Sequence, residues 1–125
     1  MIDSYRDLDV WQHAMELVEK VYAISKNFPA DERFGLGAQL RRAAVSIPSC
    51  IAEGNVRHTT RDYLRFVSIA AGSTAEVETQ VLLAKRLGFT DSELAKDVLE
   101  HCNRVGRMLN RLRQSLKARL EDVKA

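Results

Sequence analysis

The sequence contains little of what interrupts helices or builds disulfide scaffolds. Only two prolines and six glycines occur in 125 residues, which leaves room for long helices because both residues disfavour a helix interior. The two cysteines, Cys50 and Cys102, form no spaced framework, so we expect them to be reduced and buried in a cytoplasmic protein. No apolar run is long enough to span a membrane, and the acidic N-terminal stretch lacks the apolar centre of a secretory signal. We therefore expect one globular domain with no membrane partner.

Sequence motifs of the common enzyme classes are also missing. The chain contains neither G-x-S-x-G nor the phosphate-binding G-x-x-x-x-G-K-[ST] pattern. The Glu-x-x-His pattern of di-iron bundles is absent, and His13, His58 and His101 fall in three different segments. Asp97 and His101 stand four residues apart without a third ligand, so we interpret them as a solvated pair on one helix. The expectation is a protein without enzyme activity, cofactor, metal or small-molecule substrate.

Four stretches of the chain repeat apolar residues at the alternating three- and four-residue spacing of packed helices. The predicted helices span about residues 8–27, 31–54, 60–87 and 91–119. Because the links between them are short, consecutive helices should be antiparallel neighbours. The predicted fold is all-α, a single antiparallel up-down-up-down four-helix bundle over residues 1–125. Pro48 lies inside the second helix, where it removes a backbone N–H and crowds the preceding turn, so we expect a kink or break there.

Residues at the boundaries of the third and fourth predicted helices match known start and stop patterns. Thr59 stands three residues before Asp62, and Thr90 stands three residues before Glu93, which is the spacing of a capping box. Gly88 follows the third helix, where glycine commonly stops a helix by adopting positive φ.

Charge alternates in sign along the chain. The net charge is −4 over residues 1–32, +4 over 33–65, −3 over 66–100 and +5 over 101–125. One interpretation is that segments of opposite sign pair with one another, within a chain or between copies. The other is that the basic segments contact the phosphates of a nucleic acid. The overall charge of only +2 argues against strong non-specific binding by a monomer.

Arginines in the two basic segments fall at helical spacing. Three of them are spaced i, i+4, i+8 and three are spaced i, i+3, i+7, so each set should line one helix face. Arginine is well suited to phosphate, and we predict all six as contacts to structured RNA or DNA. Few aromatic residues stand beside them, which disfavours sequence-specific recognition of single strands. The six are Arg57, Arg61, Arg65, Arg104, Arg107 and Arg111.

The apolar face of the first helix is wider than one core requires. Trp11, Met15 and Tyr22 form a stripe beside the predicted core stripe. An exposed apolar surface of this kind indicates a contact with another chain. We therefore expect a homo-oligomer with these residues at its interface.

Two stretches of the sequence form a recognisable pattern. The first holds Gln39–Ser49 (QLRRAAVSIPS) and Ile51–Gly54 (IAEG), and the second opens with Tyr63–Phe66 (YLRF) and closes on Leu82–Leu87 (LLAKRL). Over about residues 5–116 the chain resembles the four-helix bundle family of 23S rRNA intervening-sequence proteins, also called S23 ribosomal proteins. Cys50 departs from the pattern, because members usually carry Asn at that position.

The resemblance implies a bacterial protein whose antiparallel four-helix bundle assembles into a five-fold ring, a homopentamer. Some members are encoded inside insertions of 23S rRNA genes, and a distantly similar group binds nucleic acid beside a reverse transcriptase. No enzyme activity or cofactor is attached to the family. Together with the charge pattern, this favours a non-enzymatic oligomer that binds structured RNA or other nucleic acid. The alternative is a protein–protein interaction scaffold whose charged faces serve ring assembly or an acidic protein partner.

Overall fold

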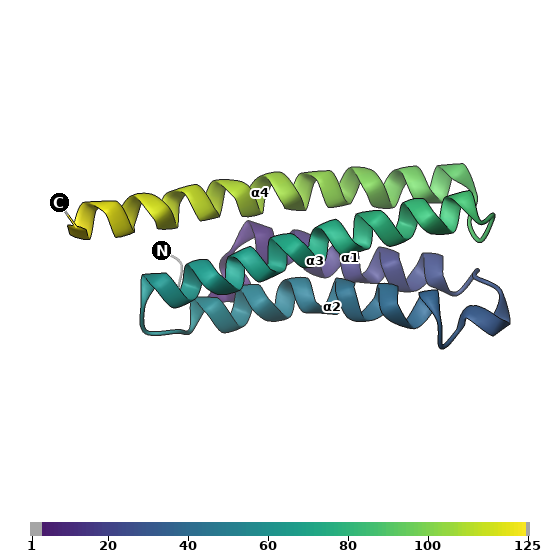
Figure 1. Cartoon of the computed structure of the whole chain (residues 1–125), viewed down its shortest axis with the longest axis horizontal. Helices are drawn as coiled ribbons and strands as arrows, with labels where there is room; N and C mark the ends of the chain where they lie inside the picture. Colours follow the sequence, from purple (N-terminus) through teal and green to yellow (C-terminus); the bar gives the residue numbers. More distant parts are fainter. Residues whose placement is uncertain (1–3, 125) are drawn as a thin grey trace.

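Residues 4–124, which the computed structural model describes, form four α-helices and no strand. The helices are α1 (Asp9–Ser25), α2 (Leu36–Asn55), α3 (Thr60–Arg86) and α4 (Ser92–Lys124). All four lie along the long axis of the molecule (Figure 1). The α1–α2 and α3–α4 links lie at one end, and the α2–α3 link lies at the other (Figure 1). The prediction of an all-α four-helix bundle is confirmed.

Two helix boundaries differ from those predicted by five residues, and the others agree to within two residues. The second helix begins at Leu36 and not near residue 31, because Ala30–Glu32 form a separate 3-10 helix. The Glu32 carboxylate then accepts a hydrogen bond from the Leu36 backbone N–H at 3.1 Å, at the new start of α2. The fourth helix runs to Lys124, past the predicted end at residue 119, since no glycine or proline stops it there. The second helix continues through the buried Pro48 without a break.

Capping hydrogen bonds fix the starts of α3 and α4. The Thr59 hydroxyl accepts a hydrogen bond from the Asp62 backbone N–H at 3.1 Å, as predicted. At α4 the cap is Asp91, whose carboxylate accepts a first-turn backbone N–H at 2.8 Å. The prediction of Thr90 as that cap was wrong by one residue, because a carboxylate at the following position reaches the same turn. Gly88 ends α3 at a φ of +75°, the left-handed conformation that glycine adopts readily.

Each helix contributes one apolar stripe to a shared core. Leu17 on α1, Leu40 on α2, Val77 on α3 and Leu109 on α4 are all fully buried. The stripes lie along the contacts α1–α2, α2–α3, α3–α4 and α1–α4, so each helix has two neighbours. Among the described helices, none combines the length and apolarity that crossing a bilayer requires.

Helices α2 and α3 approach each other closely at two points. The hydroxyls of Ser46 and Ser73 lie 2.9 Å apart across the pair. Near the end of α2, Gly54 packs on the first turns of α3, where a Cβ at this glycine would lie 2.8 Å from the Phe66 Cβ. Small residues at these points let the two backbones approach each other. This close approach fixes the position of the α2–α3 link, which carries Arg57, relative to the two helices.

Candidate nucleic-acid interface

The three predicted arginines of α4 lie on the outer face of that helix. Arg104, Arg107 and Arg111 are exposed, whereas Val105 and Leu109 on the opposite face are fully buried. Within the part of the chain that the structure describes, none of the three arginines forms an ion pair. Pairing of these arginines with acidic segments of the same chain, one of the two interpretations of the charge alternation, is therefore not observed.

Arg107 borders a groove between α3 and α4 that is rich in hydrogen-bond donors. The groove has a volume of about 410 Å³, and Ala71, Ala75 and other small residues of the two helices line it. Arg113 also lines it, and the Arg113 Nε is buried without a hydrogen-bond partner among the described residues. The polar side chains of α4 that line the groove are those of Asn103, Arg107, Asn110 and Arg113. Two guanidinium groups and two amides thus face a groove with a single carboxylate, that of Glu78.

Sequence reasoning did not single out Arg113, although it lies in the same basic run. The available signal was its position three residues after Asn110 and seven after Gly106, which places these three residues on one side of α4, the side that faces α3. Without the position of α3, that side of the helix cannot be distinguished from any other part of the outer face.

Arg104 faces a different groove, between α1 and α4. This groove has a volume of about 320 Å³ and is lined by carboxylates of both helices, namely Glu16, Asp97 and Glu100. Lys20 also lines it and pairs with Asp97 at 2.7 Å. Because acidic groups surround Arg104, its attraction for phosphate is weaker than that of Arg107.

The arginines around the α2–α3 link do not form the predicted helical stripe. Arg57 lies in the link, because α2 ends before it and α3 begins after it. Its guanidinium pairs with Glu53 at 2.8 Å and lies 4.7 Å from the centre of the Phe66 ring. The Arg65 guanidinium lies 4.7 Å from the same ring, while Arg61 is exposed and without an ion pair among the described residues. The structure thus brings Arg57 and Arg65 together on one aromatic ring, with Arg61 nearby in sequence and facing solvent.

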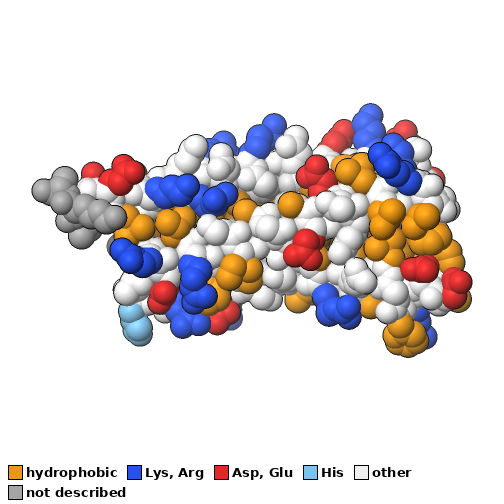
Figure 2. Space-filling model, viewed as in Figure 1, with side chains coloured by type: hydrophobic (Ala, Val, Ile, Leu, Met, Phe, Trp, Pro, Cys, Tyr) orange, Lys and Arg blue, Asp and Glu red, His pale blue; other side chains and the backbone are white. Residues whose placement is uncertain are grey.

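Basic side chains are unevenly distributed over the molecule. On the face drawn in Figure 2, Lys and Arg occur at both ends, but they lie closest together over the half that holds the α2–α3 link and the C-terminal part of α4 in Figure 1, while Asp and Glu are more frequent over the other half. A polyanion that approaches this half meets a locally positive surface, although the net charge of the chain is only +2.

The three residues predicted for an oligomer interface separate into two places. Trp11 and Met15 line one groove of about 380 Å³ between α1 and α2, together with Val45 and Pro48. Tyr22 lies apart from it in another groove, where the Arg41 guanidinium is 6.0 Å from the centre of its ring. The structure therefore places two of the three residues on one continuous apolar surface.

The two cysteines are free thiols. Cys102 is buried as predicted, whereas Cys50 is only half-buried. Burial, with a smaller contribution from the nearby Glu78 carboxylate, raises the pKa of Cys102 to about 12. Burial therefore disfavours the thiolate, which is the nucleophilic form of cysteine.

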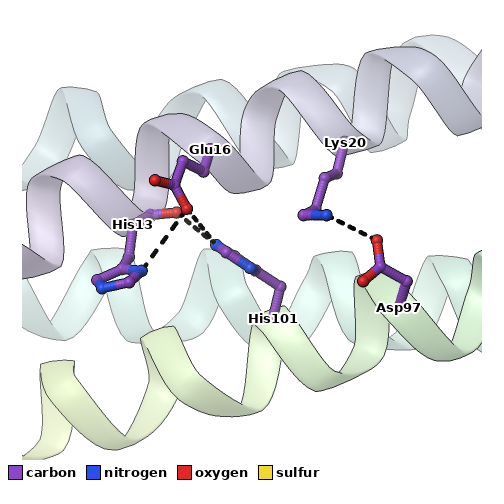
Figure 3. Close-up of polar contacts among 5 residues, drawn as sticks. All are labelled: His13, Glu16, Lys20, Asp97 and His101. Carbon is purple, nitrogen blue, oxygen red and sulfur yellow. Dashed lines mark hydrogen bonds and ion pairs between the residues drawn. The ribbon is translucent and has the colours of Figure 1, made fainter.

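The fold brings together two histidines that lie far apart in the sequence. The His101 Nε2 on α4 lies 2.9 Å from the His13 carbonyl oxygen on α1. One oxygen of Glu16 is 3.7 Å from the His101 Nε2 and 3.8 Å from the His13 Nδ1 (Figure 3). Asp97, the residue that the sequence suggested as a neighbour of His101, pairs with Lys20 instead. The exposed His58 lies in the α2–α3 link, outside this cluster.

The comparison with protein families decides the affiliation of the chain. The model of the family described as 23S rRNA-intervening sequence protein matches residues 6–111. The chain belongs to this family. A crystal structure of a family relative, a protein of unknown function from the S23 ribosomal protein family of Bacteroides thetaiotaomicron, superimposes with a TM-score of 0.78. The two chains share 18% identity, and the match covers 84% of this chain and 95% of the relative, which shows a common fold. No curated protein matches the sequence.

Proposed function

We propose that this chain is a non-enzymatic, cytoplasmic protein that binds structured RNA through the outer face of α4. The observation that supports the proposal most is the set of Arg104, Arg107 and Arg111, exposed and without ion pairs among the described residues. The groove that contains Arg113 adds amide and guanidinium donors beside this face. Phosphate is a fitting ligand for such donors, because a guanidinium can donate two parallel hydrogen bonds to it.

Structured RNA is favoured over single strands by what surrounds the arginines. Single-strand recognition requires exposed aromatic rings on which bases stack, and no aromatic residue lines the groove beside Arg107. Phe66, the ring beside Arg57 and Arg65, is 8% exposed and already covered by their guanidinium groups. Double-stranded RNA is recognised mainly by its shape and through its phosphates and ribose hydroxyls.

The test is fluorescence anisotropy of a labelled RNA hairpin and a matched DNA duplex over about 50–300 mM salt, a range in which phosphate contacts weaken measurably. For wild-type protein we expect saturable binding whose logarithm falls linearly with the logarithm of salt concentration. Replacing Arg104, Arg107 and Arg111 with alanine should weaken binding and reduce that slope by about 2–3, since each phosphate contact contributes roughly 0.7–0.9.

A second triple variant controls for net charge. Arg33, Lys85 and Arg86 are exposed at the end of the molecule that holds the α1–α2 and α3–α4 links, so replacing them with alanine removes the same charge elsewhere. This control should retain the wild-type slope. Absence of binding at the lowest salt, or an equal loss in both triple variants, would refute an α4 interface.

Self-association is the second element of the proposal, and the apolar groove between α1 and α2 supports it. Met15 and Val45 are each 40% exposed there, beside Trp11, which leaves an apolar surface open to solvent. We expect light scattering after size-exclusion chromatography to give a multiple of the 14.1 kDa chain mass, with five copies expected from the family resemblance. Met15→Glu should shift the mass toward one chain, whereas Tyr22→Glu, in the separate groove, should not. An assembly that weakens as salt rises would favour pairing of the alternating charged segments instead.

A further inference from the structure

We propose that His13, Glu16 and His101 form a binding site for a divalent transition-metal ion that joins α1 to α4. Arg104 of the arginine face lines the same groove, but none of the three donors is an arginine, and the site does not depend on the proposed RNA binding. It rests on three donor atoms from two helices that converge on one point (Figure 3).

The distances between the donor atoms are close to those of a metal site. One ring nitrogen of His13, one carboxylate oxygen of Glu16 and one ring nitrogen of His101 all lie within 4.8 Å of one another. Donor–metal bonds of about 2.1 Å at tetrahedral angles place donors about 3.4 Å apart. The two contacts of the carboxylate oxygen, 3.7 and 3.8 Å, exceed this value by a few tenths of an ångström. The two histidine nitrogens, which lie within 4.8 Å of each other, must approach by up to about 1.4 Å to bind one ion. The Glu16 side chain is 59% exposed, so it can rotate without disturbing the core.

The His13 Nδ1 lacks a satisfactory partner in the described structure. This nitrogen is buried and has no hydrogen bond, an arrangement that costs free energy in any protein. The Glu16 oxygen lies 3.8 Å from it, beyond hydrogen-bond distance. An ion bound between them would satisfy both groups at once.

His101 provides the third donor from across the helix pair. Its side chain is 9% exposed, so packing restricts the orientation of its ring. To bind a metal, the Nε2 must carry no proton and must exchange its 2.9 Å contact with the His13 carbonyl for the ion. That carbonyl lies inside α1, where the helix itself supplies a backbone N–H four residues later, so it stays satisfied.

Two imidazoles and one carboxylate select the class of ion. Zn²⁺ and the neighbouring transition metals accept imidazole nitrogen, whereas Mg²⁺ and Ca²⁺ prefer oxygen ligands throughout. Three protein donors leave one coordination position for water. The α1–α4 groove, which Glu16 and His101 line beside Asp97 and Glu100, gives the ion a path from solvent. Lys20 neutralises Asp97, and Arg104 and Glu100 are opposite charges on the same groove, so nearby charges largely offset each other.

Isothermal titration calorimetry of the full chain with ZnCl₂ tests the site. We expect one Zn²⁺ per chain for the wild type. His13→Gln and Glu16→Gln should each weaken binding by roughly 10- to 100-fold or more, because the loss of a ligand costs at least as much as the loss of its supporting hydrogen bond. His58→Gln and Glu19→Gln, at exposed positions outside the cluster, are the matched controls and should bind as the wild type does.

Co²⁺ in place of Zn²⁺ adds a spectroscopic readout that reports on coordination directly. The wild type and both controls should show visible absorption bands of a low-coordinate Co²⁺ site, and His13→Gln should lose them. Zn²⁺ should also raise the melting temperature of the wild type but not that of Glu16→Gln, because an ion that binds only the folded state stabilises it. His101→Gln changes a buried side chain, so the decision rests on His13 and Glu16. Unchanged Zn²⁺ affinity in His13→Gln and Glu16→Gln, or no saturable binding to the wild type, would overturn the proposal.

Discussion

Replacing Gly54 with alanine should destabilise the protein, although alanine is the better helix former. Gly54 is buried in the last turn of α2 and packs on the first turns of α3. An added Cβ would lie 2.8 Å from the Phe66 Cβ, 3.0 Å from the Tyr63 Cδ1 and 3.3 Å from the Tyr63 carbonyl oxygen. The first and last of these atoms belong to the α3 backbone or are bonded directly to it, so no side-chain rotation moves them away.

The expected change in the free energy of unfolding for Gly54→Ala follows from two opposing effects. Alanine gains up to about 1 kcal/mol over glycine inside a helix. Overpacking of a close contact costs about 1–3 kcal/mol. Relief at Gly54 requires α2 and α3 to separate, so the cost lies in the upper part of that range. We expect a net loss of about 1–2 kcal/mol in the free energy of unfolding, which lowers the melting temperature by roughly 3–5 °C per kcal/mol for a chain of this size.

Gly72→Ala is the matched control for this prediction. Gly72 lies in the interior of α3, and a Cβ there meets no atom within 4 Å. This variant should gain up to about 1 kcal/mol, so the two alanine variants should differ by about 2–3 kcal/mol. Urea unfolding followed by circular dichroism, at one protein concentration, measures both. Equal stabilities of the two variants, or a gain at Gly54, would refute the close approach of α2 and α3.

Three further predictions concern single side chains. Burial raises the pKa of Cys102 from 9.0 to about 12, so the folded state keeps a proton that the unfolded chain releases. The free energy of unfolding should therefore fall by up to about 1.4 kcal/mol per pH unit as the pH rises from 9 toward 12, and urea titrations of Cys102→Ala should lack this component. Asp91→Ala should cost about 1 kcal/mol in urea unfolding through loss of the α4 cap, whereas an equal loss in Thr90→Ala would contradict that assignment. Lys20→Ala breaks a partly exposed ion pair with Asp97 and should lower the free energy of unfolding in urea by no more than about 1 kcal/mol; a larger drop would mean that this pair holds α1 against α4.

The two proposed roles of the arginine face make different demands on the assembled protein. For RNA binding, Arg104, Arg107 and Arg111 must remain exposed when copies associate. For the protein–protein interaction scaffold, they would pair with carboxylates of a neighbouring copy or of an acidic partner. Anisotropy with purified oligomer therefore distinguishes the two roles, because arginines that are paired between copies contribute no salt-dependent RNA affinity.

Local features of the sequence were sufficient to predict the helices. The four apolar stripes depend on spacings of three and four residues, and the Thr59 cap and the Gly88 stop involve partners only a few residues apart. Interactions at such short range are largely independent of the rest of the fold. The family pattern, too, consists of residues that are contiguous or nearly so, and it is therefore recognisable in the sequence over most of the chain.

The packing of the helices against one another decided which residues come together in each candidate site. His13 and His101 are 88 residues apart, and only the packing of α1 on α4 brings their rings together. The same packing separates Tyr22 from the groove of Trp11 and Met15. Helical periodicity gives the direction in which a side chain points around the axis of its helix. Which residue of another helix it contacts depends on how the two helices pack against each other. Sequence therefore determined which residues face outward, and tertiary structure determined which of them face each other.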